Sequence, residues 1–348
     1  MEHLRVLIAD SSPVYKKMFT QAVTEAGKNT SIICASDSDG VLGLIKRHNY
    51  DIIIVDAEIP GLGLIELLKK IMRDIPKAFI LVTARPSSAG GDLFLNAMSY
   101  GAAECMTKPI YDSYGENLEI IERKVADIVA ARLSDRDKRI SKHEVEAVKV
   151  KKTPRKSKFH PEIILIAAST GGPAALEIII PKIRWDIPVP VLVVQHISSP
   201  FTATLAHHLN QKSHLAVKVA ENNETISAGN VYFAPGGMHM RLDAKNNIRL
   251  NDDLPVNGVR PAANVLFESV AEAVNISGVL SVILTGMGTD GKDGVARLKE
   301  KKDCFCLAQS ERTCVVYGMP RAVVENGLAD KVMDLEKIPL ELDSFEYV

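Results

Sequence analysis

The chain has 348 residues, which is more than one typical domain, so two domains are the first expectation. It is 46% hydrophobic and 24% charged and has a net charge of -1, as an ordinary soluble globular protein does. The near-neutral balance argues against a nucleic-acid-binding surface, and no apolar run approaches the ~18 residues that cross a bilayer. We therefore expect a cytoplasmic protein that neither binds nucleic acid nor inserts into a membrane.

Residues 1–132 alternate apolar, strand-like runs with amphipathic, helix-like stretches. This rhythm predicts a parallel sheet with helices on both faces, and ligands then bind beyond the carboxyl ends of the strands. The candidate strands are 4–9, 31–36, 51–56, 79–83 and 104–107.

Four polar side chains follow the ends of these strands. Asp10 and Asp56 each close an apolar run, Thr83 ends the fourth strand, and Lys108 follows the fifth. At one edge of a parallel sheet, such a set suits a phosphorylatable carboxylate. The acids would hold a hard divalent cation, while the lysine and the hydroxyl would steady phosphoryl oxygens.

This set resembles the receiver domain of response regulators, which has a flavodoxin-like, five-stranded parallel sheet. The resemblance implies that Asp56 is the phosphoacceptor and that Thr83 and Lys108 are the switch residues.

The same resemblance implies an Mg²⁺ site at Asp10, Asp56 and Glu58. Receivers carry two adjacent acids after the first strand, whereas Ser11 stands in the second position here. In the family, the acid at that position is a direct metal ligand. A degenerate receiver that works as a constitutive cap or docking domain is the alternative.

From 133 to 160 the sequence becomes polar, with six bases and no acid between Lys149 and Lys158. This composition predicts a solvated, charged linker between two domains. Contact with nucleic acid or an acidic partner is the other interpretation of the basic run.

Residues 161–348 begin a second α/β unit. We expect strands at 162–169, 188–196 and 281–285, a helix at 173–180, and hairpin-forming strands over 228–251 with turns at 235–237 and 246–247.

The stretch "IILIAASTGGPAAL" at 163–176 places Ser169 and Thr170 between a strand and a helix. Exposed N–H groups at a helix start favour a phosphate or a developing oxyanion, and a plain tight turn is the third possibility. A dinucleotide fingerprint or a Walker loop needs glycines at other spacings and, in the Walker loop, a lysine, and neither pattern is present.

A serine nucleophile needs a base within reach, and the base needs an acid that orients it. His196 ends an apolar strand and would lie at the same sheet edge as Ser169, while Asp290 lies in a glycine-rich loop. His239, which also follows a glycine-rich turn, is a rival for the base. The order Ser169, His196, Asp290 matches no common triad, but a triad is defined by geometry.

Six segments carry a second resemblance. They are "AASTGG", "QHISSPFT", "APGGMHM", "VRPAANVLFESV", "ILTGMGTDG" and "CVVYGMP". They follow one another as in the catalytic domain of the chemotaxis protein-glutamate methylesterases, the CheB family. The resemblance puts Ser169, His196 and Asp290 on the family's triad positions. It puts Thr170 and the N–H of Met287 where oxyanion stabilisation is proposed.

The two resemblances together imply a receiver, a charged linker and a Rossmann-like α/β methylesterase domain with an added β-hairpin. The implied reaction is hydrolysis of glutamyl γ-methyl esters on methyl-accepting chemotaxis receptors, with deamidation of receptor Gln by the same route. The esterase would need no cofactor and would act as a monomer, regulated by phosphorylation of Asp56 from a chemotaxis histidine kinase. A non-catalytic signalling scaffold, a transcriptional regulator and a nucleotide-binding protein are the alternatives.

Overall fold

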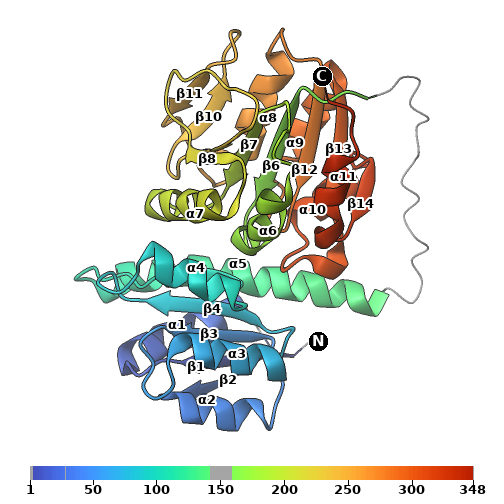
Figure 1. The fold of residues 1–348 in the computed structure, drawn as a ribbon. Helices are drawn as coiled ribbons and strands as arrows, with labels where there is room; N and C mark the ends of the chain where they lie inside the picture. Colours follow the sequence, from blue (N-terminus) through green and yellow to red (C-terminus); the bar gives the residue numbers. More distant parts are fainter. Residues whose placement is uncertain (1–2, 28, 142–158, 348) are drawn as a thin grey trace. The chain divides into compact units, whose positions relative to one another are not determined.

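The computed structural model describes residues 3–27, 29–141 and 159–347. The chain divides into two compact units, 1–145 and 146–348, and each is a layered α/β fold (Figure 1). The last helix of the first unit continues to Ser141, beyond the expected domain end at 132. The part of the expected linker from 142 to 158 lies outside the described residues.

The first unit is built on a parallel sheet with strand order β2-β1-β3-β4-β5, which confirms the predicted receiver-like fold. Every residue of the central strand β3 is buried, because helices cover both faces of the sheet. Helix α1 packs against α5, and α3 packs against α2 and α4. The strands are β1 (Leu4–Ala9), β2 (Thr30–Ala35), β3 (Ile52–Asp56), β4 (Phe79–Ala84) and β5 (Glu104–Thr107). The helices are α1 (Pro13–Ala26), α2 (Ser38–Ile45), α3 (Leu64–Asp74), α4 (Gly91–Ser99) and α5 (Tyr114–Ser141).

The second unit is built on a seven-stranded parallel sheet with order β14-β13-β12-β6-β7-β9-β8. All residues of β6, β7 and β12 are buried, which is why these strands read as unbroken apolar runs in the sequence. The strands are β6 (Ile163–Ala168), β7 (Val191–Gln195), β8 (Ala216–Val219), β9 (Asn230–Phe233), β12 (Gly278–Ile283), β13 (Asp303–Gln309) and β14 (Lys331–Met333). The helices are α6 (Gly172–Ile179), α7 (Ser199–Lys212), α8 (Ala263–Glu272), α9 (Lys292–Lys301), α10 (Met319–Glu325) and α11 (Ile338–Asp343), with short turns η1 (Ile180–Lys182), η2 (Glu311–Thr313) and η3 (Leu335–Lys337).

The predicted hairpin is present but is shorter than the sequence suggested. Strands β10 (His239–Leu242) and β11 (Ile248–Asn251) pair antiparallel, and Asn246 takes a positive φ in the turn between them. The preceding strand β9 pairs parallel with β7 and β8 instead, so the turn at 235–237 connects the main sheet to the hairpin. The run 231–233 is buried throughout, as a strand inside a parallel sheet requires.

The loops at the carboxyl edge of this sheet are tied together by one buried hydroxyl. Thr285 Oγ1 accepts hydrogen bonds from the N–H groups of Val315 and Val316, each at 3.1 Å. It donates to the carbonyl oxygen of Thr170 at 2.9 Å. The loops after β6, β12 and β13 therefore meet at one side chain.

Replacing Thr285 with Val keeps the shape of the side chain but removes these bonds. Each buried N–H group left without a partner costs about 1–3 kcal/mol, so with two such groups the second unit should lose about 2–6 kcal/mol of unfolding free energy. Urea unfolding of the full chain measures the change. Thr285→Ser retains the hydroxyl and is the control. A Val variant as stable as the Ser variant would contradict the role given to this hydroxyl.

Candidate active site

Ser169 and His196 follow neighbouring strands at the same edge of the sheet. The last residues of β6 and β7, Ala168 and Gln195, are partners in the parallel register. The His196 N–H donates to the Ala168 carbonyl at 3.0 Å, and the Ser169 N–H donates to Thr285 O at 3.0 Å. The structure therefore places the backbones of Ser169 and His196 side by side, at the ends of β6 and β7.

The predicted acid is bonded directly to the predicted base. His196 Nε2 lies 2.8 Å from Asp290 Oδ2, and Asp290 is only 2% exposed. The N–H groups of Ala263 and Asn264, in the first turn of α8, also donate to this carboxylate, at 2.6 and 3.1 Å. Burial alone would raise the pKa of Asp290, but the hydrogen bonds from His196 and the helix N–H groups lower it below its ordinary value. Asp290 is therefore a fixed anion.

The imidazole of His196 has one nitrogen left for chemistry. Because the ionised Asp290 carboxylate can only accept, Nε2 is the donor of the bond between them, and Nδ1 is the nitrogen left for proton exchange. Among the described residues, no hydrogen bond joins the Ser169 hydroxyl to this imidazole. Such bonds commonly form only when substrate completes the site.

The glycine-rich loop after β12 passes directly behind Ser169. A Cβ added at Gly286 would lie 2.8 Å from the Cβ of Ser169, so only a glycine allows this approach. The next N–H along the chain is that of Met287. Thr170, the second predicted oxyanion residue, is 6% exposed and lies beside the nucleophile in the turn into α6.

The rival histidine has a structural role. His239 is fully buried, accepts a hydrogen bond from the Ala262 N–H through Nδ1, and lies 3.1 Å from Leu254 O through Nε2. Both ring nitrogens therefore hold the segment that leads into α8.

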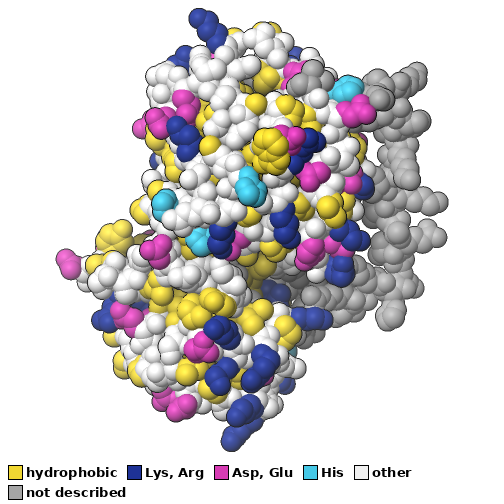
Figure 2. Space-filling model, viewed as in Figure 1, with side chains coloured by type: hydrophobic (Ala, Val, Ile, Leu, Met, Phe, Trp, Pro, Cys, Tyr) yellow, Lys and Arg dark blue, Asp and Glu magenta, His cyan; other side chains and the backbone are white. Residues whose placement is uncertain are grey.

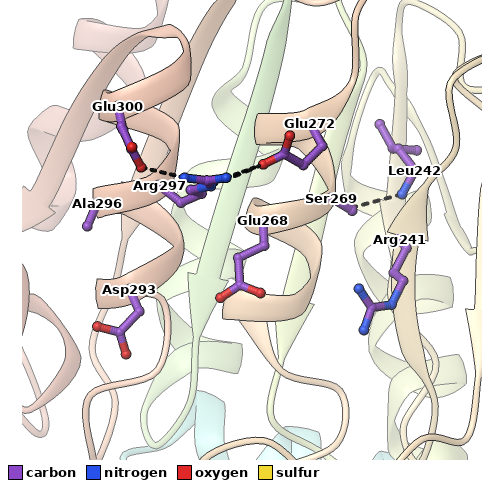
Figure 3. Close-up of a pocket in the computed structure, with 9 residues that line it drawn as sticks. All are labelled: Arg241, Leu242, Glu268, Ser269, Glu272, Asp293, Ala296, Arg297 and Glu300. Atoms are coloured by element: carbon purple, nitrogen blue, oxygen red, sulfur yellow. Dashed lines mark hydrogen bonds and ion pairs between the residues drawn. The ribbon is translucent and has the colours of Figure 1, made fainter.

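Two hollows in the second unit differ in what they offer chemically. The larger one, about 830 Å³, lies between β10, α8 and α9, where Arg297 bridges Glu272 and Glu300 (Figure 3). It is lined mainly by charged groups and contains no histidine or cysteine. The smaller one, about 470 Å³, contains His196, with Gly236, Gly237 and Arg260 around it. The smaller hollow is therefore the candidate substrate site.

Sequence reasoning missed three residues that hold this edge in place: Gln195, Asn264 and Thr285. Asn264 Oδ1 accepts hydrogen bonds from the N–H groups of Gly291 and Gly294, both at 2.9 Å, and so caps α9 from the start of α8. The only signal in the sequence is a polar residue at the end of an apolar strand or at the start of a helix.

In the first unit, Lys108 joins the two strand-end aspartates. Its ammonium lies 2.6 Å from Asp10 and 3.0 Å from Asp56, and all three side chains are buried. Burial raises the pKa of Asp10 above its ordinary value, although Lys108 opposes this effect. Thr83 pairs with Asp56 in the sheet register, and its hydroxyl donates weakly to Val55 O at 3.4 Å.

The third expected metal ligand is held elsewhere. Arg85 Nε donates to Glu58 at 2.7 Å, and hydrogen bonds from Ser88 and Arg85 lower the pKa of Glu58. Within 3–27, 29–141 and 159–347, no three His, Cys, Asp or Glu side chains form a group that could hold a metal ion. Two carboxylates, those of Asp10 and Asp56, converge at Lys108.

The visible surface carries charges of both signs. Each unit presents basic and acidic side chains on the face shown in Figure 2. None of the helices in the described part of the chain is both long enough and apolar enough to cross a membrane.

Comparisons with known proteins agree with this geometry. The CheB methylesterase family matches residues 164–342, and the response regulator receiver domain matches residues 6–117. The chain is 35% identical to the protein-glutamate methylesterase/protein-glutamine glutaminase of Halalkalibacterium halodurans, over 96% of each chain. It is 35% identical to the protein of that name in Bacillus subtilis, over 98% of each chain. The crystal structure of the Thermotoga maritima CheB methylesterase catalytic domain matches with 42% identity and a TM-score of 0.50, covering 52% of this chain and 97% of that one. The chain therefore belongs to the CheB methylesterase family and carries a receiver domain ahead of its catalytic domain.

Proposed function

We propose that this chain hydrolyses glutamyl γ-methyl esters on methyl-accepting chemotaxis receptors, with Ser169 as nucleophile, His196 as general base and Asp290 as the acid that orients it. The observation that carries this proposal is the 2.8 Å bond between His196 and a buried, ionised Asp290, next to the Ser169 turn. The names of the curated relatives support the substrate class.

The reaction proceeds through an ester on Ser169. The hydroxyl oxygen attacks the carbonyl carbon, and its proton passes to His196 Nδ1. The negative charge that develops on the carbonyl oxygen faces the Met287 N–H and Thr170, and one such donor contributes about 10²–10³ in rate. The tetrahedral intermediate formed by this attack then breaks its bond to the methoxy group. The methoxy group takes the proton from His196 and leaves as methanol. Water then attacks the ester carbonyl on Ser169 and gives its proton to His196. His196 returns this proton to the Ser169 oxygen, and a glutamate side chain is released.

The same route serves receptor Gln. Attack on a side-chain amide gives the same acyl-enzyme, and ammonia leaves in place of methanol. Because the acyl-enzyme is common to both substrates, its hydrolysis needs no additional residue. The relatives are named for both activities.

Removing the nucleophile should abolish turnover. We expect Ser169→Ala to lower methanol release from methylated receptor membranes by at least about 10³-fold, and addition of His196→Ala to cause little further loss, because the triad acts as one unit. Ser281→Ala removes a buried hydroxyl in the middle of β12 and is the matched control. Release by Ser169→Ala at a rate similar to that of the control would rule out the assignment.

Asp290 should also couple stability to pH. Because folding lowers its pKa, the ionised group stabilises the fold above the unfolded pKa of about 3.9, and this contribution is lost as pH falls through the lower folded pKa. The difference in unfolding free energy between wild type and Asp290→Asn should therefore be largest near neutral pH and shrink below about pH 4. Urea unfolding at several pH values measures it. A difference that stays constant from neutral to acid pH would contradict this linkage.

For the receiver, we propose phosphorylation at Asp56 with Mg²⁺ held by Asp10 and Asp56. Two carboxylates face one ammonium there, so one negative charge is left for a cation to balance. Mg²⁺ usually binds through one or two carboxylates together with phosphate oxygens. Asp10 and Asp56 supply two carboxylates, so they suit Mg²⁺ even without the acid that Ser11 replaces. When bound, the ion would neutralise charge on the transferring phosphoryl group. Glu58 stays a predicted ligand.

Lys108 and Thr83 are placed to hold the product of this transfer. The Lys108 ammonium, already 3.0 Å from Asp56, would donate to a phosphoryl oxygen. The Thr83 hydroxyl would exchange its weak bond to Val55 for another phosphoryl oxygen. Phosphorylation would then increase the esterase activity of the chain by shifting its conformational balance.

Acetyl phosphate with Mg²⁺ should label the full chain at Asp56. Asp56→Asn should remain unlabelled, whereas Asp51→Asn, at the opposite edge of the sheet, should be labelled as wild type is. Methanol release should rise on treatment of the wild type and stay unchanged in Asp56→Asn. Complete lack of label on the wild type, with and without Mg²⁺, would refute the receiver proposal while leaving the esterase proposal intact.

A further inference from the structure

Gln195 bonds to the backbone of both the predicted nucleophile and the predicted base. It is the last residue of β7 and is 2% exposed. Its Nε2 lies 2.9 Å from the carbonyl oxygen of Ser169 and 3.3 Å from that of His196. A carboxamide nitrogen carries two hydrogens, so one group can donate to both carbonyls.

The orientation of this amide is fixed by its surroundings. Turning it over would place Oε1 against two carbonyl oxygens, which are also acceptors. In the observed orientation, Oε1 occupies the space that a Cβ on residue 172 would need, because a side chain there would collide with it. A Cβ at residue 172 would also lie 2.9 Å from the Cβ of Ala168, so Gln195 and Ala168 together require Gly172, whereas Gly171 is required by its own φ of 78°.

The amide acts where the sheet can no longer hold the two residues together. The register between β6 and β7 ends at Ala168 and Gln195, and the last backbone bond runs from His196 N–H to Ala168 O. Past this point Ser169 turns into α6 and His196 leads toward α7. The Gln195 side chain is the next cross-link between the two segments.

We propose that Gln195 is a positioning residue that sets the separation of Ser169 and His196. This inference rests on the proposed function, since it assumes that the two side chains exchange a proton. A displacement of about 1 Å between reacting groups can cost about 10²-fold in rate, so a side chain that fixes both backbones controls the chemical step.

Gln195→Met tests this role, because methionine has nearly the same length and donates no hydrogen bond. We expect kcat for methanol release to fall about 10–100-fold, with KM for methylated receptor within about twofold of wild type. The rate at which a small organophosphonate modifies Ser169 should fall by the same factor, since that reaction needs no receptor. The control is Leu298→Ala, which destabilises the fold by leaving a cavity at the buried face of α9. At a temperature where this variant is folded, its rates of methanol release and of reaction with organophosphonate should equal those of wild type.

Gln195→Glu adds a pH-dependent signature, measured over the pH range in which the variant stays folded. When protonated, the introduced carboxyl group can donate one hydrogen bond to Ser169 O; when ionised, it can donate none and repels both carbonyls. Burial should raise its pKa into the working range. The variant should therefore lose activity as pH rises, whereas the wild type should not.

Two results would overturn the proposal. One is a folded Met variant that reacts with organophosphonate at the wild-type rate, and the other is a Glu variant with the pH profile of the wild type. Neither result would affect the triad itself, which is refuted only if Ser169→Ala still releases methanol.

Discussion

Two helices of the methylesterase domain cap each other, and Asp290 is one of the caps. Asp290, in the loop before α9, accepts hydrogen bonds from the first N–H groups of α8. Asn264, in the first turn of α8, accepts hydrogen bonds from the N–H groups of Gly291 and Gly294 at the start of α9. The start of α8 therefore supplies donors to Asp290, and the start of α9 supplies donors to Asn264. A carboxylate buried without such partners would be protonated or expelled to solvent. The charge that orients His196 exists because this exchange is complete.

Most residues at the carboxyl edge of the sheet in the second unit could be located from the sequence. Strands buried on both faces appear as unbroken apolar runs, and parallel strands place their carboxyl ends at one edge, so Ser169 and His196 could be expected there together. Asp290 was predicted from a loop whose glycines allow close backbone approach, and Gly286 does lie directly against Ser169. The receiver was predicted in the same way, from Asp10, Asp56 and Lys108 at strand ends.

Other features leave no local pattern. The strand β9 has the length and turn residues of a hairpin arm, and its place in the parallel sheet depends on partners tens of residues away. Thr285 and Gln195 act through bonds from a side chain to the backbone of a distant loop, and such bonds have no characteristic spacing. The pairing of Glu58 with Arg85 is of the same kind.

The two acidic sites differ in how their charge is balanced. The Asp290 carboxylate is matched by helix N–H groups and an imidazole, so its buried charge is fully compensated. At the receiver site, two buried carboxylates share one ammonium, and the surplus charge favours any ligand that brings positive charge or takes up the lysine. A site whose buried charge is compensated gains little from a new ligand, whereas a site with uncompensated negative charge is stabilised by a ligand that brings positive charge. The buried charge beside His196 is therefore balanced as it stands, whereas the charge of the two aspartates at Lys108 is not.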